Sequence, residues 1–422
     1  MTKISSLRLM ALQNELESGN ADALAIFWRE IDKLGAPLVE SIERDSDYSW
    51  VTFLWRAEKD IKNVIVLSQL DGSFFYVADK TLTRMLDTDL WYKTYRVRND
   101  VRTTYRFSED DSLVHLGEDN DQEKRRANWR HDPLNPRTFV FPPDQDNQGK
   151  QVIDSVLELP AAPPQLWILP KPGVPAGQVK EFRLRSEILD NERRVWVHTP
   201  PGYTSASQAY GLLILFDGHA YAKVIPTPTI LDNLLAANLI PPLVTIMVET
   251  PEQTRYQELG CYPPFNEFLV QELVPWIRQQ YHVTSDPSHT VVGGLSRGGL
   301  AAAFAGLRHP HIFGKVLSQS GAFWWRAKGA HAKDSSQEFE WLTRQFAVSE
   351  KQPLSFYLDV GLLEDWFETP PSILLTNRHM RNVLLAKGYP VHYAEFNGGH
   401  ESLCWRGTLA DGLLALVGRG SE

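Results

Sequence analysis

The stretch HTVVGGLSRGGLAAAF, residues 289–304, carries the strongest local pattern in this sequence. Its apolar first half predicts a buried strand, and its alanine-rich second half predicts a helix. Between the two stands Gly-Leu-Ser-Arg-Gly, with Ser296 at the centre. Glycines on both sides of a serine permit a sharp turn at which helix and sheet approach without Cβ clashes. The pattern therefore predicts a strained strand-to-helix turn that presents the hydroxyl of Ser296 as a nucleophile.

The sequence on both sides of this turn shows one alternating pattern from about residue 179 to the C-terminus. Helical stretches separate apolar runs, which are GLLILFDG (211–218), PPLVTIMVE (241–249), KVLSQSG (315–321), LSFYLDVG (354–361) and VHYAEFNGG (391–399). Uninterrupted apolar strands that alternate with helices indicate a mostly parallel sheet buried on both faces. Together with the turn at Ser296, they predict an α/β-hydrolase catalytic domain over residues 179–422.

Residues 1–145 have a different character. Residues 1–35 show a helical pattern and predict an N-terminal arm, whereas short runs rich in Val, Tyr, Phe and Trp follow from Trp50. These runs are VTFLWRA (51–57), NVIVLSQL (63–70), LWYKTYRV (90–97) and TTYRFS (103–108). Such runs predict an antiparallel, Ig-like β-sandwich. The Pro/Gly-rich residues 146–178 predict a linker between this domain and the catalytic domain.

A serine hydroxyl needs a base and an acid to become a nucleophile. In α/β-hydrolases these partners follow the serine in the order acid, then histidine. His400 comes directly after the strand-like run VHYAEFNGG and is the expected base. The acid should follow LSFYLDVG, where Glu364 and Asp365 are neighbours. Either carboxylate could hold the imidazole in the required tautomer, so we favour Glu364 and keep Asp365 as the alternative.

The developing oxyanion requires two N–H donors. The backbone amide of Arg297, directly after the nucleophile, is expected to be one of them. The second should come from the loop after GLLILFDG, from the backbone of Gly218 or His219.

Composition limits the classes of partner. The formal net charge of −9 argues against nucleic acid, because phosphate binding requires a basic surface. No apolar run is long enough to span a membrane. The N-terminus lacks the apolar core of a signal peptide, so we expect a cytoplasmic protein without an obligate protein partner.

The cysteines and histidines indicate neither a disulfide framework nor a metal site. Cys261 and Cys404 are the only two cysteines, and a metal-ligand spacing such as H-E-x-x-H is missing from the sequence. We therefore expect no protein cofactor.

Several longer motifs resemble those of the enterochelin (enterobactin) esterases, cytoplasmic enzymes that hydrolyse the trilactone of a catecholate siderophore. They include VTFLWR (51–56), ANWR (127–130), FGKVLSQSGAFWW (313–325) and NGGHESLCWRGTL (397–409). The resemblance covers nearly the whole chain and implies the catalytic residues Ser296, His400 and Glu364. It also implies that iron arrives as part of the substrate, and that the N-terminal domain covers the substrate.

A flat, anionic catecholate should be bound by aromatic rings and guanidinium groups. The residues that we expect to bind it are Arg255, Arg297, Trp324, Trp325 and, from an N-terminal lid, Arg130. One alternative remains within the enzyme class, a feruloyl- or acetyl-ester hydrolase whose β-domain binds carbohydrate. Another is a siderophore-binding protein that has lost catalysis, against which the intact Ser296 and His400 argue.

Overall fold

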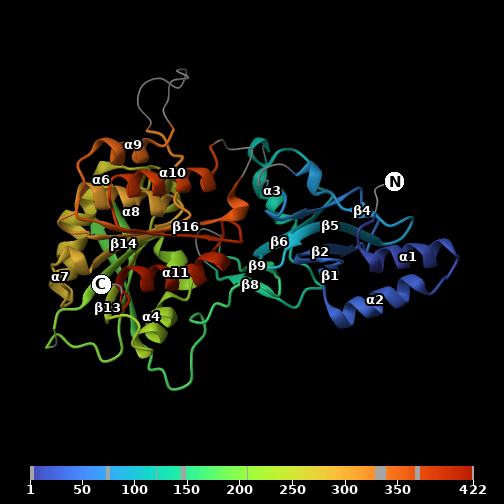
Figure 1. Cartoon of the computed structure of the whole chain (residues 1–422), viewed down its shortest axis with the longest axis horizontal. Coiled ribbons are helices and arrows are strands. Elements are labelled where there is room, and N and C mark those ends of the chain that lie inside the picture. Colours follow the sequence, from blue (N-terminus) through green and yellow to red (C-terminus); the bar gives the residue numbers. More distant parts are fainter. Residues whose placement is uncertain are drawn as a thin grey trace. The chain divides into compact units, whose positions relative to one another are not determined.

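The computed structural model describes residues 4–72, 77–119, 121–143, 149–206, 208–327, 339–365 and 371–420. These residues form two compact units (Figure 1). The first unit contains the chain up to Pro163, and the second begins at Pro164. One short segment near the C-terminus, Asn397–Glu401, belongs to the first unit although its neighbours on both sides belong to the second.

The first unit is built on two antiparallel sheets, as the short aromatic runs predict. One sheet has the order β1 (Leu38–Ile42), β2 (Asp45–Arg56), β5 (Leu90–Arg98), β4 (Thr83–Arg84). The other has the order β3 (Val64–Leu67), β6 (Arg102–Glu109), β9 (Val152–Glu158), β8 (Thr138–Phe141), and β7 (Trp129–Arg130) also pairs with β6. Phe53 of β2 meets Tyr105 of β6 edge to face, with ring centroids 4.7 Å apart. The two sheets therefore share an aromatic core, and the predicted β-sandwich is confirmed.

The N-terminal arm consists of α1 (Leu7–Glu17) and α2 (Ala23–Leu34). Leu12, Phe27 and Ile31 are fully buried and pack in one cluster with Leu54 and Leu90 of the sheet. A further helix, α3 (Gln122–Ala127), lies in the polar stretch that precedes β7. The arm is thus an integral part of the first unit.

The expected linker, residues 146–178, contains a strand. Val152–Glu158 forms β9, which pairs with both β6 and β8. The division between the units consequently falls at Pro163–Pro164, later than the position 145 expected from composition. The proline-rich segment begins only after this strand, at Pro160.

The second unit contains an eight-stranded sheet. Its order is β10 (Gln178–Ser186), β11 (Asn191–Thr199), β13 (Leu243–Val248), β12 (Gly211–Phe216), β14 (Thr290–Leu295), β15 (Lys315–Gln319), β16 (Ser355–Gly361), β17 (Val391–Phe396). The six strands from β13 to β17 are parallel, and the β10–β11 hairpin joins them antiparallel. Every residue of β13 and β14 is buried, as expected for a sheet covered on both faces. The α/β-hydrolase fold is confirmed.

Helices cover both faces of this sheet (Figure 1). On one face, a hydrophobic cluster joins the sheet to α7 (Val274–Gln280), α8 (Arg297–Arg308), α9 (Trp341–Val348) and α10 (Ile373–Ala386). On the other face, a second cluster contains residues of α4 (Thr227–Ala236) and α11 (Ser402–Val417). The shorter helices α5 (Glu252–Glu258) and α6 (Pro263–Glu267) follow β13. This layering leaves the carboxyl ends of the parallel strands as the place for chemistry.

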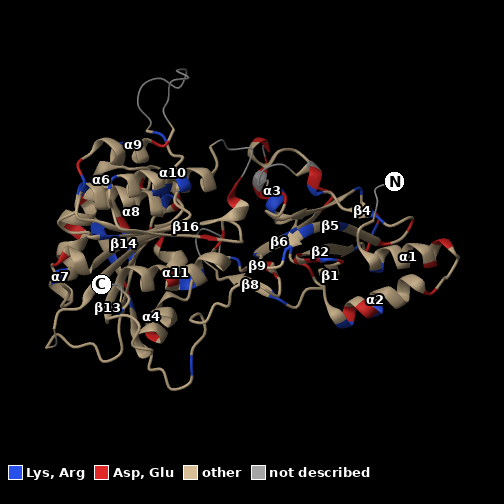
Figure 2. Ribbon diagram, in the orientation of Figure 1, with Lys and Arg blue, Asp and Glu red and all other residues tan. Residues whose placement is uncertain are grey.

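Acidic and basic residues are interspersed along both units rather than segregated (Figure 2). In the part of the chain that the structure describes, no helix combines the length and the apolarity that crossing a bilayer requires.

Candidate active site

Ser296 occupies the strained turn between β14 and α8 that the sequence predicts. Its backbone has φ 54° and ψ −116°, a conformation that L-residues rarely adopt. Its amide donates to the carbonyl of Gln319 at 2.8 Å, and its carbonyl accepts from the amide of Ala322 at 3.0 Å. A Cβ on Gly294 would lie 2.6 Å from the backbone of Gly298, so this turn requires glycine. The neighbouring strand β15 and the residues after it therefore hold a turn that only flanking glycines permit.

The two candidate acids have different surroundings. Glu364 ends the short 3₁₀ turn Leu362–Glu364 after β16 and is fully buried. Its Oε1 accepts hydrogen bonds from the hydroxyl of Ser320 and the amide of Gly361, both at 2.7 Å. Asp365 is exposed and accepts from the hydroxyl of Ser372 at 2.7 Å. A triad acid is buried and oriented, so this geometry supports Glu364.

Ser320 is a residue of the site that the sequence reasoning missed. It follows β15 with φ 49°, and its hydroxyl also accepts from the indole N–H of Trp405 at 2.9 Å. Its position near the carboxyl end of the predicted strand KVLSQSG was the available signal. Ser320 links the end of β15 to the candidate acid.

His400 lies in the segment Asn397–Glu401, which packs with the first unit. Its backbone amide donates to Oε1 of Gln69 at 3.0 Å. The next residue, Glu401, is buried and accepts from the amide of Thr104 at 2.9 Å. The loop that bears the predicted base is therefore held by residues of the β-sandwich, far away in sequence.

The expected oxyanion donors lie at the ends of β12 and β14. Gly218 is buried, and a Cβ there would come within 2.6 Å of the carbonyl of Met247, so the loop after β12 requires glycine at this place. Arg297 is the first residue of α8, where backbone amides have no partner within the helix. Gly218 and Arg297 thus lie in local structures of the type expected for oxyanion donors.

Arg255, expected to bind substrate, forms an ion pair with the loop after β12. Its Nε and Nη2 donate to the two carboxylate oxygens of Asp217, each at 2.8 Å. Asp217 has φ 56° and directly precedes Gly218. This bidentate pair ties α5 to the oxyanion loop, which gives Arg255 a structural contact that the sequence did not suggest.

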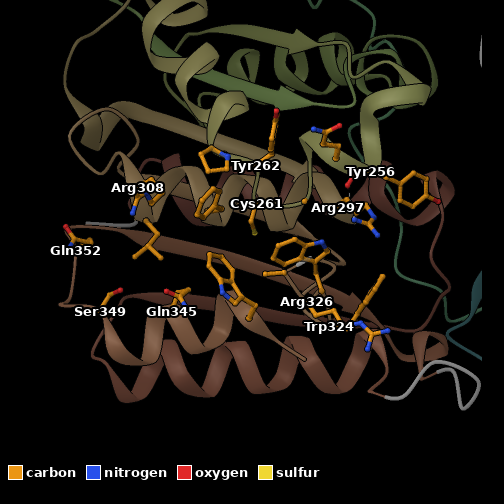
Figure 3. A pocket seen from close by; sticks show the side chains of 18 of the residues that line it. Tyr256, Cys261, Tyr262, Arg297, Arg308, Trp324, Arg326, Gln345, Ser349 and Gln352 are labelled. Carbon is orange, nitrogen blue, oxygen red and sulfur yellow. Dashed lines mark hydrogen bonds between the residues drawn. The ribbon is translucent and has the colours of Figure 1, made fainter. Parts of the chain in front are cut away.

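A cavity of about 1440 Å³ lies beside α8 (Figure 3). Its aromatic and basic lining residues are Tyr256, Tyr262, Phe304, Trp324, Trp325, Trp341, Arg297, Arg308 and Arg326. The described residues that line it include no Asp or Glu. Although the whole chain has a formal net charge of −9, this cavity is therefore cationic and aromatic.

Arg297 connects the nucleophile turn to this cavity. Its guanidinium lies 4.5 Å from the ring centroid of Tyr256 and 5.5 Å from that of Trp324. Burial lowers the pKa of this guanidinium, which the nearby Arg255 lowers further, while Tyr256 raises it. An arginine nevertheless stays protonated at neutral pH. The predicted residues Arg297, Trp324 and Trp325 therefore come together in one cavity, whereas Arg255 does not line it.

The cavity follows one face of α8. Arg297, Phe304 and Arg308 all line it, and they span the helix from its first residue to its last. Eleven residues of helix correspond to roughly 16 Å. A ligand with several aromatic arms could thus extend from the nucleophile turn to the end of the helix.

Arg130 lies on β7 of the first unit. Its side chain is exposed and donates to the carbonyl of Ala127 at 2.8 Å. Its neighbour Trp129 is half-buried, with the guanidinium of Arg106 5.6 Å from its ring. A role of Arg130 in covering the substrate stays a prediction.

Both cysteines are buried free thiols. Cys261 lines the cavity, and burial raises the pKa of its thiol well above the usual range. Within the described residues, no group of three or more His, Cys, Asp or Glu side chains could hold a metal ion.

Two family models match this chain. The one described as "Putative esterase" matches residues 186–416, and the one described as "Enterochelin esterase, N-terminal" matches residues 50–168. The iron(III) enterobactin esterase of Dickeya dadantii (strain 3937) is 31% identical over 423 residues, which cover 93% of this chain and 92% of the relative.

Two solved structures extend this similarity. The ferric enterobactin esterase from Salmonella typhimurium superposes with a TM-score of 0.73 at 28% identity, covering 93% of this chain and 98% of that one. The enterobactin esterase from Shigella flexneri, crystallised in the presence of enterobactin, gives a TM-score of 0.71 at 28% identity, with 90% and 96% covered. Both units of this chain therefore have counterparts in these structures.

Proposed function

This chain belongs to the iron(III) enterobactin esterase family and is a carboxylic ester hydrolase, and on that basis we propose that it hydrolyses the trilactone of a catecholate siderophore. Cleavage of the ester bonds would break the macrocycle and release the iron that the substrate carries. The observation that carries this proposal is the cavity beside α8.

The cavity suits an anionic catecholate in charge and in shape. Three arginines line it, and the tryptophans and tyrosines beside them offer flat faces for catechol rings. Arg297, held between Tyr256 and Trp324, lies directly after the nucleophile in the chain. A negatively charged aromatic arm bound here would be adjacent to the turn of Ser296.

In the proposed mechanism, the hydroxyl of Ser296 attacks the ester carbonyl and His400 accepts its proton. Glu364 orients the imidazole and stabilises its protonated form. The amides of Arg297 and Gly218 donate to the oxyanion. His400 then transfers the proton to the leaving alkoxide of the substrate's own serine as the first ester bond breaks, and water hydrolyses the acyl-enzyme.

The proposal also includes the expected roles of Arg130 and of the first unit, the origin of the iron and the location of the reaction. Arg130 and the first unit cover the bound substrate, and the iron belongs to the substrate and not to a protein site. We place the reaction in the cytoplasm, where the buried free thiols Cys261 and Cys404 would stay reduced.

The test is to incubate the protein with the ferric and the metal-free catecholate trilactone and to separate the products by chromatography. We expect linear esters and the catecholoyl-serine monomer from the wild-type protein, and intact trilactone with Ser296→Ala. A serine-directed phosphonate should label the wild-type protein at Ser296 alone.

Feruloyl and acetyl esters serve as the competing substrates in the same assay. The first unit favours the siderophore, because residues 50–168 match the enterochelin esterase N-terminal model. Inertness toward both trilactones, together with rapid hydrolysis of feruloyl esters, would refute the proposal.

A further inference from the structure

The segment Asn397–Glu401 belongs to the first unit, whereas the residues before and after it belong to the second. The chain leaves the second unit after β17, contributes five residues to the first unit and returns at α11. This segment bears His400, the proposed base. What holds it is therefore relevant to catalysis.

The segment completes an open edge of β6. Residues Arg102–Tyr105 of β6 pair with β9 on one side, whereas β3 on the other side ends at Leu67, opposite Arg106. The amide of Arg102 donates to the carbonyl of Asn397 at 3.0 Å. The amide of Thr104, which points to the same edge, donates to the Glu401 carboxylate at 2.9 Å. The segment thus accepts hydrogen bonds from the amides of Arg102 and Thr104, which lie beyond the end of β3.

Glu401 anchors one side of the histidine. Besides the amide of Thr104, the hydroxyl of Thr104 also donates to its carboxylate. Glu401 is 9% exposed, and burial raises the pKa of its carboxyl, while the hydrogen bonds from Thr104 lower it. A buried carboxylate needs such donors, so these hydrogen bonds fix the residue after His400 against β6.

Gln69 contacts the segment directly at the backbone of His400. It lies just beyond β3, and its Oε1 accepts from the amide of His400 at 3.0 Å. A Cβ on Gly399 would lie 2.6 Å from Nε2 of Gln69, so a side chain at this position would displace the amide of Gln69. Asn397 is fixed as well, since its Nδ2 donates to Asp100 at 2.5 Å.

We propose that the first unit positions the catalytic base, with Gln69 and Thr104 as the positioning residues on either side of His400. The proposal rests on the assigned role of His400 as base. It gives the β-sandwich a function in the chemical step in addition to covering the substrate. An imidazole displaced by about 1 Å from its productive place can lose about 100-fold in rate, so the two anchors should act on kcat.

The test uses the full-length protein and p-nitrophenyl acetate, a small ester that does not depend on the cavity beside α8. Thr104→Val removes the hydroxyl bond to Glu401, and Gln69→Leu removes the acceptor for the amide of His400. We expect each variant to lower kcat by about 10- to 100-fold with little change in KM. Thr104→Ser, which retains the hydroxyl, should restore most of the rate.

The matched control is Thr94→Val. It removes a threonine hydroxyl bond of the same kind, between Thr94 and Thr52 at 2.9 Å, in the other sheet of the first unit. Its kcat should stay within about twofold of the wild type. Thermal melting of Thr94→Val and Thr104→Val then separates loss of stability from loss of positioning.

Equal kcat values in Thr104→Val, Gln69→Leu and Thr94→Val would overturn the positioning role, and so would a loss confined to KM. His400→Ala separates this failure from failure of the proposed mechanism. A wild-type rate in His400→Ala would refute the base and its positioning together. An inactive His400→Ala beside fully active Thr104→Val and Gln69→Leu variants would refute the positioning alone.

Discussion

The hydroxyl of Ser320 donates a 2.7 Å hydrogen bond to Oε1 of Glu364 inside the second unit. The amide of Gly361 donates to the same oxygen, and the indole of Trp405 donates to the Ser320 hydroxyl. Three elements of the fold, β15, β16 and α11, thus orient one buried carboxylate. The adjacent Asp365 is exposed and accepts a hydrogen bond from the hydroxyl of Ser372. This difference leads to the first prediction.

Glu364→Gln should lower kcat by about 10³- to 10⁴-fold, because the amide cannot stabilise the imidazolium and can select the wrong tautomer. Asp365→Asn, the matched control one residue away, should change kcat by no more than about threefold. Steady-state hydrolysis of p-nitrophenyl acetate measures both variants. A larger loss in Asp365→Asn than in Glu364→Gln would assign the acid to Asp365.

Arg297→Gln should weaken the binding of an anionic catecholate without removing the oxyanion donor, because the backbone amide is retained. We expect KM for the ferric trilactone to rise about tenfold, as for one lost charge-assisted contact, and KM for p-nitrophenyl acetate to stay the same. Arg183→Gln removes an exposed arginine of β10 whose partner Glu192 lies 3.4 Å away, and serves as the control. Equal effects of the two substitutions on KM would exclude a specific role of Arg297.

The wild-type KM for the ferric trilactone should also rise with ionic strength, because salt screens the attraction between the arginines and an anionic substrate. Titration with sodium chloride between low and high ionic strength measures this dependence, and p-nitrophenyl acetate, which is uncharged, provides the comparison. A KM for the trilactone that does not respond to salt would argue against charge recognition in the cavity.

Glu258→Ala should destabilise the second unit strongly. Arg193 of β11 is fully buried and pairs with Glu258 of α5 at 2.9 Å, so the substitution leaves a buried charge without its partner. Loss of one member of such a pair costs about 3–5 kcal/mol of unfolding free energy. Glu192→Ala breaks the exposed pair with Arg183 and should cost at most about 1 kcal/mol. Urea denaturation measures the unfolding free energy of both variants. Similar losses of unfolding free energy in the two would contradict the prediction.

Asp359 predicts a dependence of stability on pH. Burial, opposed by a hydrogen bond from Thr408 and assisted by the nearby charge of Glu364, raises the pKa of this carboxyl to about 8. In the unfolded chain the carboxyl ionises near pH 4, so the folded protein binds the proton more tightly. The resulting stability is complete below about pH 4 and is lost as the pH rises through about 8.

Asp359→Asn should therefore resist alkaline destabilisation. Between pH 6 and pH 9, the loss of unfolding free energy should be about 2.5 kcal/mol smaller in the variant than in the wild type. Urea titrations at both pH values provide the measurement. An identical loss in both proteins would mean that Asp359 does not titrate in this range.

The turn at Ser296 could be predicted because its determinants are local. A strained φ, a close approach of Gly294 to Gly298 and a helix that packs tightly on its strand require specific residues within a few positions of the serine. The parallel sheet was predictable for a similar reason, since burial on both faces makes each strand uniformly apolar. Strand β9 was not, because it lies between a polar stretch and a proline-rich stretch, and its pairing with β6 is not recorded in the local sequence.

Amino-acid order alone thus determined the hydrolase fold and indicated Ser296 as the candidate nucleophile, together with a short set of candidate partners. Only the tertiary structure gave Glu364 and Asp365 different surroundings, since one of these neighbouring carboxylates is buried and the other is exposed. It also joined Arg255 to Asp217, and Gln69 to His400 across 331 positions. Such contacts depend on where strands that are remote in sequence lie in the folded protein. A local sequence pattern therefore cannot identify a partner hundreds of residues away.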